Sequence, residues 1–91
     1  MKYELVLTNT AIKDIERHKK SGNKAILNKL HRLLQELMNH PKTGSGNPEI
    51  LKYNLQGLYS RRIDKKHRLV YSIEEEAVTV FVLSAHSHYK E

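Results

Sequence analysis

The residues of this chain that could do chemistry lie in its second half. They combine a carboxylate, an imidazole, a phenol and three basic side chains, namely Glu49, Lys52, Arg62, Arg68, His88 and Tyr89. A carboxylate and an imidazole can exchange protons with a substrate, and guanidinium groups stabilise the charge that grows on a phosphate in a transition state. These residue types therefore predict proton transfer at both ends of a phosphodiester.

The charge of the chain points to the same substrate class. Sixteen Lys and Arg against ten Asp and Glu give a net charge of +6, which favours a polyanionic partner through phosphate contacts and counterion release. With a candidate acid and base, this indicates RNA, because its 2′-hydroxyl supplies a nucleophile that DNA lacks. The chain has no cysteine, and His86 and His88 have no third ligand at a recognisable spacing, so we expect no metal and no other cofactor.

Length and hydropathy limit the organisation. The 91 residues fit one domain, 1–91, with a single core. No apolar run is long enough to cross a bilayer, and the N-terminal segment lacks the apolar centre of a signal peptide. We therefore expect no membrane contact and a cytoplasmic location.

The elements that must position these residues follow from periodicity. The apolar pattern predicts a strand at 3–8, a helix that ends near Gly22, a second helix from about Asn23 to before Pro41, a loop at 42–48 that carries Glu49, and strands at 58–64, 68–73 and 77–85. The short connection between the helices predicts a helix hairpin packed over the sheet. The short breaks between the late strands predict antiparallel pairing. The fold class is therefore α+β, in the order β-α-α and then antiparallel strands.

Side-chain parity constrains the two candidate arginines. Successive side chains of a strand point to opposite faces, so the turn between the two strands decides whether Arg62 and Arg68 lie together. A two-residue turn at Lys65-Lys66 would place them on opposite faces, whereas a three-residue turn over 65–67 or a bulge would place them on one face. A shared phosphate site requires the longer turn or the bulge.

Each of these side chains also has a purely structural interpretation. Glu49 follows Pro48 and could cap a helical turn, and the arginines could be solvated strand residues. His88 could be an exposed terminal histidine, and Tyr89 could pack against the end of the sheet. The residue types alone leave these alternatives open.

The order of several motifs resembles a known family, the YoeB/Txe toxins of the RelE superfamily. The motifs that carry the resemblance are Gly46-Asn47-Pro48-Glu49-Ile50-Leu51-Lys52, Asn54-Leu55, Gly57, Ser60-Arg61-Arg62-Ile63, His67-Arg68-Leu69-Val70-Tyr71 and His88-Tyr89. The resemblance spans essentially the whole chain. It implies a microbial-ribonuclease-like, RelE-like twisted antiparallel sheet packed against a two-helix hairpin.

The resemblance also implies roles for single residues. Glu49 matches the general base that takes the proton of the ribose 2′-hydroxyl, and His88 matches the general acid that protonates the departing 5′-oxygen. Arg62 and Arg68 match the pair that holds the scissile phosphate, and Tyr89 matches a tyrosine that aligns the RNA. Such cleavage needs no metal and leaves a 2′,3′-cyclic phosphate and a 5′-hydroxyl.

The basic residues near this set are expected to bind RNA, namely Lys52, Lys65, Lys66 and Arg61. The implied function is that of a type II toxin, a ribosome-dependent endoribonuclease that cuts mRNA. The implied partners are a cognate YefM/Axe-like antitoxin, the ribosome with its mRNA, and operator DNA through the antitoxin complex alone; a homodimer is also compatible. The alternative is a non-catalytic toxin of the same fold, or a basic nucleic-acid-binding regulator, which has no need for both Glu49 and His88.

Overall fold

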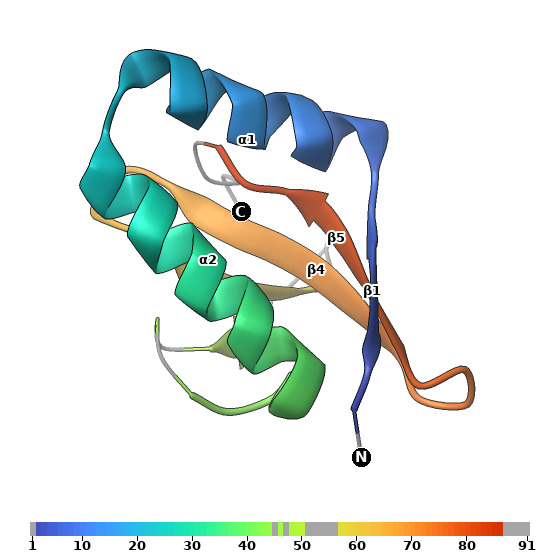
Figure 1. The fold of residues 1–91 in the computed structure, drawn as a ribbon. Coiled ribbons are helices and arrows are strands. Elements are labelled where there is room, and N and C mark those ends of the chain that lie inside the picture. The colour runs from blue at the N-terminus through green and yellow to red at the C-terminus, as the bar shows by residue number, and fades with distance from the viewer. Residues whose placement is uncertain (1, 45, 47, 51–56, 87–91) are drawn as a thin grey trace.

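The computed structural model describes residues 2–44, 46, 48–50 and 57–86. Within this part, two helices and five strands follow one another in the order β1 (Glu4–Leu7), α1 (Asn9–Ser21), α2 (Lys24–Asn39), β2 (Glu49–Ile50), β3 (Tyr59–Arg62), β4 (Arg68–Glu74) and β5 (Thr79–Ser84) (Figure 1). The α+β class predicted from the sequence is confirmed.

Local signals account for both helices. The Thr8 hydroxyl accepts a hydrogen bond from the Ala11 amide and caps α1, and the Asn23 side chain caps α2 in the same way by accepting from the Ile26 amide. Between them Gly22 has φ +73°, the left-handed conformation in which a helix ends at low cost with glycine. The predicted boundaries at Gly22 and Asn23 are confirmed.

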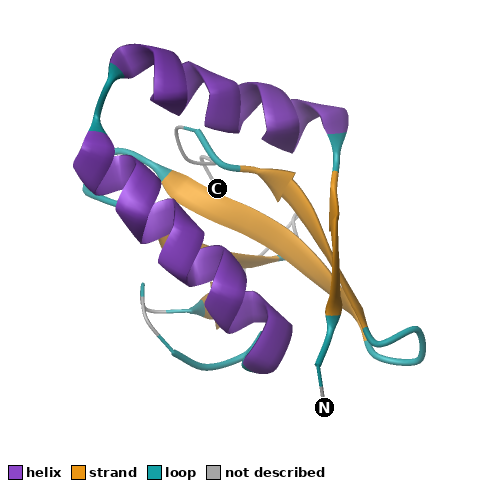
Figure 2. Cartoon of the chain, in the orientation of Figure 1, coloured by secondary structure: helices purple, strands orange, loops and turns teal. Residues whose placement is uncertain are grey.

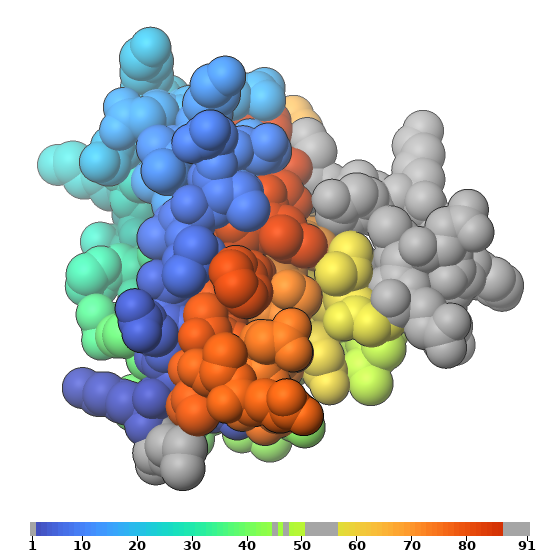
Figure 3. Space-filling model, turned by 90° about the vertical axis from the view of Figure 1, so that its right-hand side faces the viewer, coloured from blue at the N-terminus to red at the C-terminus, as the bar shows by residue number. Residues whose placement is uncertain are grey.

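The strands form one sheet in the order β1-β5-β4-β3-β2. The β5-β4, β4-β3 and β3-β2 pairs are antiparallel, but β1 pairs with β5 in parallel, so the sheet is mixed rather than antiparallel throughout. Figure 3 shows β1, in blue, lying beside β5, in red. The parallel pair joins segments that are far apart in the sequence, so no short turn between them could have predicted it.

Both helices cover the same face of the sheet (Figure 2). They form a V that opens away from Gly22, with the sheet behind it (Figure 1). The side chains buried between these layers are mostly aliphatic: Ala11, Ile26, Leu30, Leu33, Leu37, Ile63, Leu69, Tyr71, Val80, Val82 and Ala85. In the described part of the chain, neither α1 nor α2 is long and apolar enough to cross a membrane.

Candidate active site

Glu49 lies directly after the predicted loop at 42–48, in a short strand that the sequence analysis did not predict. It belongs to β2, which forms one edge of the sheet, and its cross-strand partner is Ser60 of β3. Directly paired residues of an antiparallel pair project to the same face. The sheet therefore fixes the side on which the Glu49 carboxylate lies.

The register of β3 and β4 brings the two candidate arginines together. Arg62 and Arg68 are direct cross-strand partners, so their side chains share one face. The Ile63 amide donates to the His67 carbonyl at 2.9 Å, which leaves the three residues 64–66 as the turn. The predicted turn length of three residues and the shared face of the arginines are confirmed, but the predicted position, 65–67, is wrong by one residue.

Asp64 holds this turn in place. Its carboxylate accepts hydrogen bonds from the backbone amides of Lys66 at 2.8 Å and His67 at 2.7 Å. Burial raises the pKa of Asp64, but these two donors and the nearby His67 and His18 outweigh it, and the net pKa is lowered. Lys65 and Lys66 remain exposed at the tip of the turn, where an RNA backbone could reach them.

Glu49 and Arg68 form an ion pair in the described part of the candidate site. The Arg68 Nη1 lies 2.7 Å from Glu49 Oε1 and 3.1 Å from Ser60 Oγ. The Glu49 side chain is 48% exposed and that of Arg68 is 25% exposed, so solvent and a substrate can reach both. Arg62 is exposed beside them. One carboxylate and two guanidinium groups thus share one accessible face, where they can accept a proton and bind a phosphate.

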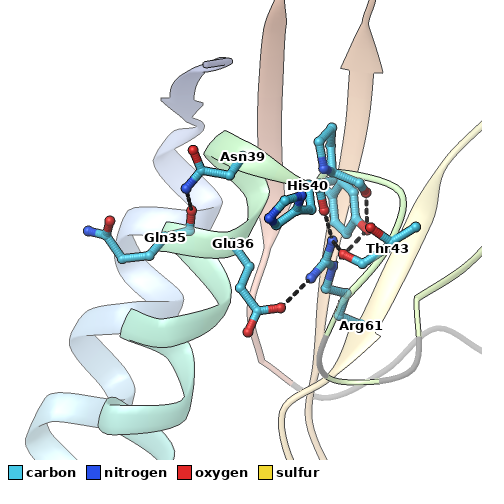
Figure 4. A network of polar contacts seen from close by, with 8 residues as sticks. Gln35, Glu36, Asn39, His40, Thr43 and Arg61 are labelled. Atoms are coloured by element: carbon cyan, nitrogen blue, oxygen red, sulfur yellow. Dashed lines mark hydrogen bonds and ion pairs between the residues drawn. The ribbon is translucent and has the colours of Figure 1, made fainter. Parts of the chain in front are cut away.

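Arg61 was expected to bind RNA, and this expectation is wrong. It is adjacent to Arg62 and therefore faces the other side of the sheet, where it is fully buried. Its guanidinium donates to Glu36 Oε1 at 3.1 Å, to the Tyr71 hydroxyl at 3.1 Å, to the Thr43 carbonyl at 2.6 Å and to the His40 carbonyl (Figure 4). Arg61 therefore ties the end of α2 and the following loop to β3.

The same loop approaches β3 again at Gly46. The Arg62 amide donates to the Gly46 carbonyl at 2.6 Å, and Gly46 has φ +79°. A Cβ at this position would lie 2.8 Å from the Arg62 carbonyl oxygen, closer than real Cβ contacts come. Glycine is therefore required here by both conformation and space.

Three predicted site residues, Lys52, His88 and Tyr89, lie outside the described residues. Their roles stay predictions. The described part of the site consists of Glu49, Arg62 and Arg68, together with Ser60, which the sequence interpretation did not single out.

The structure also brings together three histidines that the sequence interpretation left apart. The sequence suggests His86 as a possible ligand only together with His88, whereas the structure places His86 beside His18 of α1 and His67, the residue before β4. The alternation of side chains along a strand could have predicted where His67 lies. It precedes Arg68 and so points to the helix side of the sheet.

The chain matches the family model described as the YoeB-like toxin of the bacterial type II toxin-antitoxin system, over residues 7–89. It is 38% identical over 64 residues to the toxin YoeB of Escherichia coli strain K12, covering 70% of this chain and 76% of that protein.

Two solved structures show the same fold. One, described as a YoeB/ParE toxin from Agrobacterium tumefaciens, is 30% identical, covers 94% of this chain and 99% of its own, and has a TM-score of 0.86. The other is a YoeB-YefM complex from Staphylococcus aureus. Its matching chain is 32% identical, with 98% and 100% coverage and a TM-score of 0.78.

Proposed function

Because the chain belongs to the YoeB-like toxins of bacterial type II toxin-antitoxin systems, we propose that it is an endoribonuclease that cleaves mRNA on the ribosome without a metal. The observation that carries the proposal is the arrangement of Glu49, Arg62 and Arg68 on one accessible face of the sheet. These three residues come from three different strands. A carboxylate and two guanidinium groups on one face match what the cleavage of a phosphodiester requires.

The first half of the reaction uses these described residues. Glu49 accepts the proton of the ribose 2′-hydroxyl, and the 2′-oxygen then attacks the adjacent phosphorus. Arg62 and Arg68 bind the non-bridging oxygens and stabilise the charge that builds up on them. The Arg68 contact orients the Glu49 carboxylate, and the remaining N–H groups of a guanidinium can donate to phosphate at the same time.

The second half requires a proton for the leaving group. His88 donates it to the 5′-oxygen as the P–O bond breaks, which gives a 2′,3′-cyclic phosphate and a 5′-hydroxyl. Tyr89 aligns the RNA, and Lys52, Lys65 and Lys66 contact its backbone. Because the nucleophile is the 2′-hydroxyl, the proposal makes RNA the substrate and leaves DNA uncut.

The partners follow from the same proposal. The YoeB-YefM complex from Staphylococcus aureus supports a cognate YefM/Axe-like antitoxin for this chain. Operator DNA is bound only through that complex, and residues 1–91 act as one cytoplasmic domain on ribosome-bound mRNA. We also propose that the chain forms a homodimer in the absence of its antitoxin. The molecular mass of the isolated chain in analytical ultracentrifugation tests this.

The decisive experiment is single-turnover cleavage of a ribosome-bound message, with binding to ribosomes measured in parallel. Glu49→Gln keeps the shape of the side chain and removes its basicity, so we expect cleavage to slow by about 10²–10⁴ with little loss of ribosome binding. His88→Ala should have a similar effect. Arg62→Met should slow cleavage and also weaken binding, because Arg62 contacts phosphate in both the ground and transition states.

Matched controls separate chemistry from charge. Glu76→Gln changes an exposed glutamate of the β4–β5 turn, and Arg32→Met changes an exposed arginine of α2; both should cleave at the wild-type rate. Wild-type rates in Glu49→Gln and His88→Ala would refute the acid and base assignment. A folded wild-type protein that binds ribosomes but cuts no RNA would instead support the non-catalytic toxin.

A further inference from the structure

Three imidazole rings meet at one end of the sheet, on the side of the helices. His18, His67 and His86 each offer one nitrogen to a cluster in which these atoms lie within 4.8 Å of one another. The ring centroids of His67 and His86 are 4.3 Å apart. The ring centroid of His18 lies 4.7 Å from that of His67 and 4.9 Å from that of His86. The cluster joins α1, the residue before β4 and the segment after β5.

The cluster is distinct from the candidate active site. His67 and Arg68 are neighbours in the chain, so their side chains leave the sheet on opposite faces. Arg68 points to the face that carries Glu49, whereas His67 packs with His18 of α1. None of the three histidines is used in the proposed cleavage.

Backbone contacts fix the tautomer of His18. Its Nε2 lies 2.7 Å from the Ala85 carbonyl oxygen, which can only accept a hydrogen bond, so Nε2 carries the proton and Nδ1 carries the lone pair of the neutral ring. Histidines that ligate metals commonly donate their other N–H to a carbonyl in this way. The Ala85 amide donates a hydrogen bond to Asp14 Oδ2 at 2.9 Å, which holds Ala85 in place beside His18.

Charged side chains near the cluster act on a cation in both directions. Asp14 accepts a hydrogen bond from the Ala85 amide, next to His86 in the chain, and Asp64 accepts one from the His67 amide, so two carboxylates lie near the rings. Their charge attracts a cation, whereas the charge of Arg17, which lowers the pKa of His67 and His86, opposes it.

We propose that His18, His67 and His86 form a binding site for a divalent transition-metal ion of the zinc type. Imidazole nitrogens are preferred ligands of Zn²⁺, and water or a nearby carboxylate would complete a tetrahedral set. Zn–N bonds of about 2.0–2.1 Å place two such nitrogens about 3.3 Å apart, so the widest pair must close by about 1.5 Å.

Ring rotation can supply this movement. His18 and His86 are stacked with their planes 27° apart, so one of them must turn to aim its lone pair at a common point. His18 is 2% exposed and bonded to the Ala85 carbonyl, whereas His86 is partly exposed, so the proposal assigns the rotation to His86. The exposed edge of His86 is also the path by which an ion enters.

The metal would act as a cross-link between distant parts of the chain. It would join the end of α1 to the start of β4, where His67 precedes Arg68, and to the segment that follows β5. Its role is therefore structural, and it would stabilise the folded state by binding that state alone.

Binding is tested with untagged, full-length protein that has been stripped with a chelator and then titrated with Zn²⁺ by calorimetry and with Co²⁺ by visible spectroscopy. We expect one ion per chain and a tetrahedral Co²⁺ spectrum. With Zn²⁺ at 100 times its dissociation constant, the melting temperature should rise by roughly 10–20 °C. His67→Gln should weaken binding by at least about 100-fold.

Two controls locate the site. His31→Gln changes an exposed histidine of α2, and Glu49→Gln changes the candidate active site; both should bind zinc as the wild type does. In case His67→Gln does not fold, ring-nitrogen NMR of the wild type gives an independent readout, in which the His18, His67 and His86 signals shift on adding Zn²⁺ and that of His31 does not. Unchanged affinity in a folded His67→Gln, or shifts confined to other histidines, would overturn the proposal.

Discussion

Arg61→Met tests whether the buried arginine stabilises the fold. The substitution keeps an unbranched side chain in the core but removes the guanidinium N–H groups that donate to Glu36, the Thr43 carbonyl and the His40 carbonyl. Removing one partner of a buried ion pair costs about 3–5 kcal/mol. Because the Glu36 side chain is 21% exposed and can recover water, we expect the lower half of this range.

The adjacent arginine provides the control. Arg62 is exposed on the opposite face, so Arg62→Met should change the free energy of unfolding by no more than about 0.5 kcal/mol. Urea denaturation at neutral pH measures both variants, and circular dichroism before denaturation shows whether each is folded. The free energy of unfolding of a native domain is about 5–15 kcal/mol, so the Arg61→Met variant should still fold at low temperature.

The two arginines should therefore separate stability from catalysis. Arg61→Met lowers the midpoint of urea unfolding, whereas Arg62→Met leaves the midpoint unchanged and slows cleavage. A cost below about 1 kcal/mol for Arg61→Met would refute the reasoning, because a buried charge network that can be deleted at so little cost does not hold the loop to the sheet. Equal destabilisation by both variants would refute the assignment of faces.

Two further predictions concern the loop before β2 and a surface carboxylate. Gly46→Ala should destabilise the fold by more than Gly57→Ala, because both glycines have positive φ but only Gly46 has a carbonyl within 2.8 Å of the added Cβ. The backbone strain common to both is about 1–2 kcal/mol, and urea midpoints that coincide would show that the loop relaxes freely around Gly46. The Tyr3 hydroxyl and Lys42 lower the pKa of Glu75 below its ordinary value near 4.5, so NMR titration of Tyr3→Phe should show this pKa moving back up. Because the folded-state pKa is lowered, Glu75 stabilises the fold above pH 4.5, and this contribution is lost as the pH falls through the lowered pKa. An unchanged Glu75 pKa in Tyr3→Phe would disprove the hydrogen bond in solution.

Much of the fold could be predicted from local signals. The helix boundaries depend on Thr8, Gly22 and Asn23, whose effects act within one turn of the chain, and the stripe of α2 identifies its buried face. The shared face of Arg62 and Arg68 also followed from parity once a three-residue turn was assumed. These features need no knowledge of distant segments.

The errors arose where distant segments meet. The strand β2 has only two residues, Glu49 and Ile50, and it forms by pairing with β3. Two residues are too few for the sequence pattern to predict a strand. The histidine cluster combines residues from three segments, although the burial of Ala11, Asp14 and His18 along one stripe of α1 was open to prediction. Arg61 is a different case, because the parity that placed Arg62 outside already placed Arg61 inside.

The parallel pairing of β1 with β5 has a consequence for the synthesis of the protein. Thr8 at the end of β1 bonds to Leu83, 75 residues later, and at about 5–20 residues per second the ribosome needs about 4–15 s to make the partner of the first strand. Until then β1 has no place in the sheet, and α1 lacks the strand on which it packs. The nascent chain therefore cannot form this sheet before the segment around Leu83 has been made and has left the ribosome.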